Sequence, residues 1–139
     1  MKKIISASRR TELVAYYPDY MVERLRRVGT SRIHTVVVWT KDPTNLLAHR
    51  ALREALSEVG QVFIHWTVTG LGGAFVEPNV PPPDAQLALL PDIVSLVGDP
   101  RRVHWRYDPL FSARRASEHI SNVELDVFIP LAEAFGRAG

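Results

Sequence analysis

The sequence predicts an α/β fold in which four β-α units form half of a barrel, a partial TIM-type (β/α) barrel with parallel strands. Three observations predict it. Four short apolar runs alternate with segments of helical periodicity along residues 1–139, which we expect to form a single domain. The connections are short, which favours parallel strands joined by crossover helices. Each apolar run also ends in a polar group, as barrel strands do at their carboxyl ends.

The composition is that of a globular domain, and it excludes several kinds of functional site. The chain has 139 residues, of which 46% are hydrophobic and 23% charged. No apolar run approaches the roughly 20 residues of a transmembrane helix or forms a signal peptide, so we expect a cytoplasmic protein without membrane contact. The absence of cysteine excludes disulfides, thiolate nucleophiles and cysteine-bound metals. The 17 basic and 15 acidic residues only weakly indicate nucleic-acid binding.

The first half of the chain predicts two strands and two helices. Residues 4–8 form a short strand. The Ser-Arg-Arg-Thr turn after it lacks the glycines of an open doubly wound sheet, which is the alternative fold. A helix begins at Pro18 and ends before Gly29. Residues 34–40 are β-branched and form the second strand, and apolar residues at helical spacing predict a helix over 42–60.

The third strand is predicted at residues 61–69 and precedes a loop rich in glycine and proline. Its side chains alternate, so Thr67 and Thr69 share a face opposite an apolar face that we expect the helices to cover. Residues 84–97 form the next helix, in which Pro91 must either introduce a kink or begin a new helix.

The carboxyl-terminal part predicts one more strand and one more helix. Residues 103–107 form the fourth strand, which directs Arg106 and Asp108 inward. Residues 117–135 form the last helix, which has the spacing of a Ser121/Glu124 capping box and contains an unfavourable proline.

Cations lie at the carboxyl ends of three of the four predicted strands: Arg9, Arg10, Lys41 and Arg106. Because the carboxyl ends of parallel strands meet at one edge of the sheet, these side chains converge into a pocket for a carboxylate or phosphate. The alternative is that they form internal ion pairs, Arg106 with Asp108 or Arg9 with Glu12. Asp108 is either a general base or a group that orients Arg106, and we favour orientation because a carboxylate among cations stays ionised.

The aromatic residues and histidines have simpler interpretations. Trp66 and Trp105 fit a core, whereas Trp39 ends a strand and is equally suited to stack on a planar ligand. His65 and His104 lack a metal-ligand spacing, so no metal site is predicted. The sequence contains no glycine-rich phosphate loop, serine nucleophile elbow or zinc signature.

Five short motifs occur in order: Ile5-Ser-Ala-Ser-Arg-Arg-Thr, Trp39-Thr-Lys-Asp-Pro, Thr67-Val-Thr-Gly, Glu77-Pro-Asn-Val-Pro and Trp105-Arg-Tyr-Asp-Pro. Together they resemble the DUF1848 family of uncharacterised bacterial proteins. The resemblance implies a variant of the radical S-adenosylmethionine barrel, in which full-length relatives hold an iron-sulfur cluster through cysteines near the carboxyl terminus.

The resemblance also implies site residues. Those expected to act in catalysis are Lys41, Arg106 and Asp108. Those expected to bind a ligand are Ser8, Arg9, Arg10, Thr11, Trp39, Thr40, Thr67, Thr69, Gly70, Glu77 and Tyr107.

The chain departs from the family pattern in two respects. Relatives are longer and carry the cysteines that this sequence lacks, so we expect residues 1–139 to be the amino-terminal half of a longer architecture. Glu12-Leu13-Val14 also stands where the family has Asp-Ile-Pro.

Two hypotheses follow. In the first, the chain is half of a radical S-adenosylmethionine-like enzyme that is inactive alone and either self-associates or needs a missing carboxyl-terminal half, because its edge strands are unpaired. In the second, it is a non-catalytic module that binds a small anion, a nucleotide or nucleic-acid phosphate. A metal-dependent barrel hydrolase ranks behind both.

Overall fold

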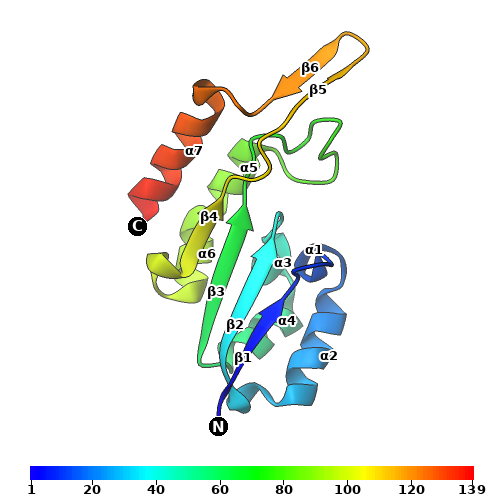
Figure 1. Ribbon diagram of the computed structural model, residues 1–139. Coiled ribbons are helices and arrows are strands. Elements are labelled where there is room, and N and C mark those ends of the chain that lie inside the picture. The colour runs from blue at the N-terminus through cyan, green and yellow to red at the C-terminus, as the bar shows by residue number, and fades with distance from the viewer.

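The fold is organised around one parallel sheet, which a computed structural model describes over residues 1–139. Its strands lie side by side in chain order: β1 (Lys3–Ala7), β2 (Ile33–Thr40), β3 (Gln61–Thr67) and β4 (Val103–Arg106) (Figure 1). The predicted α/β fold with four parallel strands is therefore confirmed, and this arrangement is consistent with part of a barrel. Since no further strand joins this sheet, β1 and β4 are its two unpaired edges.

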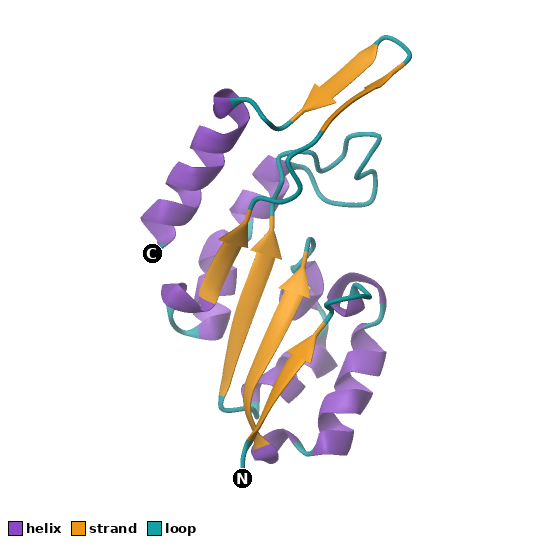
Figure 2. Cartoon of the chain, in the orientation of Figure 1, coloured by secondary structure: helices purple, strands orange, loops and turns teal.

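Seven α-helices connect and follow these strands: α1 (Leu13–Tyr16), α2 (Pro18–Val28), α3 (Thr44–Ala48), α4 (Arg50–Ser57), α5 (Pro83–Ala88), α6 (Leu90–Val97) and α7 (Leu125–Ala138). Helices α3 to α6 lie behind the sheet in the view of Figure 2, and the face toward the viewer has no helix over it. No helix of the structure has both the length and the apolar character that crossing a membrane requires.

The hydrophobic core lies between the sheet and the helices. Val36, Val38, Ile64 and Trp66 point from the central strands into this layer and are fully buried. Trp66 packs edge-on against Phe135 of α7, with ring centroids 5.6 Å apart. The alternation predicted for the third strand thus gives the buried face of the sheet.

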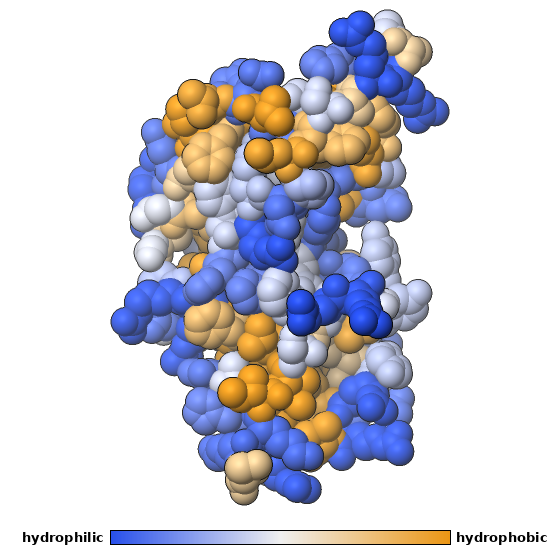
Figure 3. All heavy atoms as spheres, viewed as in Figure 1, coloured by the Kyte–Doolittle hydropathy of each residue, from blue (hydrophilic) through white to orange (hydrophobic).

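The opposite face of the sheet is only partly covered. Val37 and Phe63 are half-buried there, and Ile4 keeps 70% of its surface exposed. Figure 3 views this face and shows hydrophobic atoms over the lower part of the strands, with a hydrophilic band above them toward the strand ends.

Two predicted helices are each divided in the structure. The segment 42–60 breaks at His49, whose ring Nδ1 accepts a hydrogen bond from the Leu52 amide (3.2 Å) and so caps α4. The segment 84–97 breaks at Leu89, and Pro91 lies in the first turn of α6, where its missing N–H needs no partner. Of the two alternatives for Pro91, the structure shows a new helix.

The prediction of a helix over residues 117–135 is wrong in its first part. Residues there form an antiparallel hairpin of β5 (Ser112–Arg115) and β6 (Glu118–Ser121), and α7 begins only at Leu125. The predicted capping box is absent, since Glu124 makes no side-chain cap. The physical reason is Asn122, whose backbone amide donates to the Phe111 carbonyl (3.0 Å) and not to the carbonyl four residues earlier, as a helix would require. Its buried side chain adds three further hydrogen bonds that hold this arrangement.

Candidate anion-binding site

A cavity of about 290 Å³ lies at the carboxyl ends of the four parallel strands. Its lining residues are Ser8, Arg9, Arg10, Glu12, Trp39, Thr40, Lys41, Thr67 and Arg106. All except Glu12 are residues that the sequence predicts for the site. The cavity is polar, and three arginines line it, two from the turn after β1 and one from the end of β4.

The turn after β1 carries two of the arginines. Ser8 has a φ of 68°, a left-handed conformation that is uncommon for a residue with a Cβ. Its hydroxyl oxygen accepts a hydrogen bond from the Leu13 amide (3.0 Å), which stabilises the turn. The chain therefore reverses at Ser8, and Arg9 and Arg10 follow at the rim of the cavity.

Trp39 is part of the site and not of the core. Its ring lies near two guanidinium groups, with the Cζ atom of Arg106 4.8 Å and that of Arg9 5.4 Å from the ring centroid. The indole Nε1 donates to the Ser6 hydroxyl (3.2 Å), and the ring stacks on His65 with centroids 4.0 Å apart. Trp39 therefore lies against both arginines at the cavity.

One of the two internal ion pairs weighed from the sequence is present. Arg106 Nη2 donates to Asp108 Oδ2 (2.5 Å), which fits the orienting role that we favoured for Asp108. Arg9 makes no ion pair with Glu12, and Arg10 also has no acidic partner within ion-pair distance. The guanidinium groups of Arg9 and Arg10 are therefore free of acidic partners.

Lys41 lines the cavity and also belongs to a network of polar contacts outside it. Its ammonium group pairs with Glu77, and the other oxygen of Glu77 accepts a hydrogen bond from the Thr69 hydroxyl (2.8 Å). The Lys41 carbonyl accepts from the side chain of Gln86 (2.5 Å), which is buried. Lys41 and Glu77 also line a second cavity of about 220 Å³, so Lys41 borders both spaces.

Glu12 is the lining residue that the sequence reasoning did not include. Its Oε2 accepts a hydrogen bond from the Lys41 amide (2.9 Å), while its Oε1 is buried without any partner. Burial raises the pKa of this carboxyl, and hydrogen bonds from Lys41 and Thr40 oppose the rise. Its place directly after the Ser-Arg-Arg-Thr turn is the signal that could have revealed it.

The remaining predicted residues lie outside the cavity. Tyr107 is on the helix-covered side, where its hydroxyl donates to the Asn122 carbonyl (2.5 Å) and its ring packs against Phe128. Gly70 has a φ of 79° and faces α7, where an added Cβ would lie 2.4 Å from Val127 Cγ1. Thr11 is exposed and does not line the cavity.

His65 and His104 are neighbours on the uncovered face, with ring centroids 5.3 Å apart. The pKa of His65 is lowered, first by burial and then by the charges of His104 and Arg106, so its ring is neutral at neutral pH. No group of three potential metal ligands occurs in the structure.

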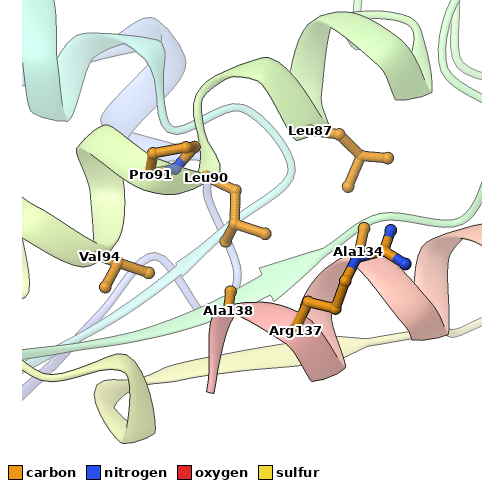
Figure 4. A pocket seen from close by; sticks show the side chains of 7 residues that line it. All are labelled: Leu87, Leu90, Pro91, Val94, Ala134, Arg137 and Ala138. Carbon is orange, nitrogen blue, oxygen red and sulfur yellow. The ribbon is translucent and has the colours of Figure 1, made fainter.

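A cleft of different character lies away from these residues. It has a volume of about 530 Å³ and is lined mainly by apolar side chains of α5, α6 and α7, including Leu87, Leu90 and Val94 (Figure 4). Arg137 is the only charged residue in its lining. This cleft contains none of the residues predicted for the site.

The fold and the site define a class: an α/β protein with a parallel half-barrel sheet and a cationic cavity at the strand ends. Within that class the chain belongs to the DUF1848 family, because the model of this domain of unknown function matches residues 27–136. The match confirms the resemblance and begins within α2, after the arginine-bearing turn. No curated protein and no solved structure matches the chain.

Proposed function

We propose that the cavity at the strand ends binds a small anion, a phosphate or a carboxylate. The observation that carries this proposal is that three arginines line one cavity and that two of them, Arg9 and Arg10, have no acidic partner. Bringing like charges together raises the free energy of the folded chain, and a bound anion offsets that repulsion. The planar guanidinium fork matches both phosphate and carboxylate through paired hydrogen bonds.

The neighbouring residues have supporting roles in this proposal. Arg106 keeps N–H groups beyond the one given to Asp108, so it can bind an anion while Asp108 fixes its direction. Ser8 and Thr67 line the same cavity, and their hydroxyl groups supply neutral hydrogen-bond donors.

Titration calorimetry with inorganic phosphate tests the proposal. The variant Arg9→Gln/Arg10→Gln should lose at least tenfold in affinity, since each charge-assisted hydrogen bond contributes about 1.5–3 kcal/mol. Arg27→Gln is the matched control, because Arg27 is also exposed but lies on α2 outside the cavity. If phosphate, sulfate and acetate all fail to bind the wild-type chain, the proposal is wrong.

A second candidate function is supported by the unpaired edges of β1 and β4 and by the sheet face without helices. In a closed barrel, strands from another half would pair with both edges and cover this face. The chain would then supply the anion-binding half of a cytoplasmic radical S-adenosylmethionine-like enzyme, with Lys41, Arg106 and Asp108 facing the reactants.

The residues of this chain do not fit the iron-sulfur cluster of such an enzyme, because there are no cysteines and no cluster of alternative ligands. The ligands of a cluster would have to come from another polypeptide segment. The cations of this chain could bind S-adenosylmethionine only through its carboxylate. Sedimentation velocity tests the need for a second half. Association at micromolar concentration is expected, and a well-folded monomer at all concentrations would refute this candidate.

A further inference from the structure

A row of aromatic rings crosses the uncovered face of the sheet. Trp39, His65 and His104 are direct neighbours in register on β2, β3 and β4. Trp39 stacks on His65 at 4.0 Å, and His65 meets the edge of His104 at 5.3 Å. Phe63 extends the group, with its ring centroid 5.0 Å from that of His104.

This row is not explained by the hydrophobic core. The core lies on the other face, and these rings have no helix above them. His104 is exposed and the other three rings are only half-buried. Aromatic rings on an open sheet, close to cations, form the kind of surface on which proteins stack nucleobases.

The row is continuous with the anion cavity. Trp39 belongs to both, and Thr67 and Arg106 lie two residues beyond His65 and His104 on the same face. Trp39 and His65 already stack on each other, and two arginines lie over the Trp39 ring, so the exposed His104 is the ring of the row on which a ligand can stack. A planar ring placed there would direct its substituent toward Arg106, two residues further along β4.

We infer that the aromatic row and the cavity together bind a nucleotide unit, with the base on the row and the phosphate on Arg9, Arg10 and Arg106. This inference rests on the proposed anion-binding function and names its ligand class. The same chemistry is offered by a free nucleotide and by a single nucleic-acid strand, and the experiment separates these two sources.

The test compares ligands that share a phosphate and differ in the base. Adenosine 5′-monophosphate should bind about tenfold more tightly than ribose 5-phosphate and should quench tryptophan fluorescence. The His104→Ala variant should reduce this preference, while His119→Ala, a control in the β5–β6 hairpin, should keep it. Thermal melting establishes that both variants are folded.

The outcomes separate the two levels of the argument. If ribose 5-phosphate binds as tightly as adenosine 5′-monophosphate, the base site is refuted while the anion site stands. If neither ligand nor inorganic phosphate binds, the base site and the anion site are both refuted. An oligodeoxyadenylate that binds more tightly than the mononucleotide, with affinity that falls steeply with salt, identifies a strand as the source, and preference for the mononucleotide identifies a free nucleotide.

Discussion

Replacing Asn122 with alanine should strongly destabilise the segment between β4 and α7. The Asn122 side chain is fully buried, and its amide nitrogen donates to the carbonyl oxygens of Thr69 and Pro109, each at 3.0 Å. Its Oδ1 accepts from the Phe111 amide at 2.6 Å. These three hydrogen bonds connect the end of β3 to the chain that leads into the hairpin.

The magnitude follows from this count of bonds. A typical intramolecular hydrogen bond contributes about 1 kcal/mol net, and buried partners left without a bond add to the loss. Asn122→Ala should therefore lower the free energy of unfolding by roughly 2–4 kcal/mol. Asn122→Asp should lower it by a similar amount, because a carboxylate keeps the shape but cannot donate to the two carbonyl groups.

Urea unfolding followed by circular dichroism measures the effect, and hydrogen exchange locates it. The amides of Phe111 and of the first turn of α7 should lose protection first. Asn79→Ala, a change at an exposed loop position, is the control and should alter stability by less than about 0.5 kcal/mol. An Asn122→Ala variant as stable as this control would refute the reasoning.

Three further predictions concern the site and its support. Glu77→Gln releases Lys41 from its ion pair, so phosphate affinity measured by calorimetry should rise about threefold. An unchanged affinity would show that Lys41 does not contribute to phosphate binding. Gly70→Ala should lower the free energy of unfolding by about 2–4 kcal/mol, measured in urea, since its φ is 79° and the new Cβ would meet Val127, whereas a neutral effect would contradict that packing. Glu12 keeps its proton to higher pH in the folded chain than in the unfolded chain, so the native state binds more protons and stability falls as pH rises above about 4.5. Glu12→Gln should remove that part of the decline, which parallel urea titrations across this range would detect, and identical slopes would refute the buried carboxyl.

Local sequence patterns predict the sheet because its determinants are local. The apolar runs at residues 33–40 and 61–67 are buried on one face through simple alternation, and short connections place consecutive strands side by side. The hairpin at 112–121 escaped prediction because its position depends on Asn122, whose partners are up to 53 residues away in sequence. A window of neighbouring residues contains no trace of such bonds.

The same contrast applies to the candidate site. The convergence of Arg9, Arg10 and Arg106 was predictable, because parallel strands bring their carboxyl ends together whatever the details of packing. The positions of Tyr107 and Gly70 outside the cavity could not be predicted, because they depend on where α7 packs. Glu12 was weighed only as a partner of Arg9, and its actual partner, the Lys41 amide, lies 29 residues away.

Lys41 lines both the space of about 290 Å³ and the space of about 220 Å³, and its ammonium group pairs with Glu77, which lines the smaller one. The position of this side chain therefore depends on the charges on either side of it. A ligand with one negative charge can be held by the arginines alone and leaves the ion pair in place. A ligand with several negative charges competes with Glu77 for the ammonium group, so the charge of the ligand would decide toward which of the two spaces Lys41 turns.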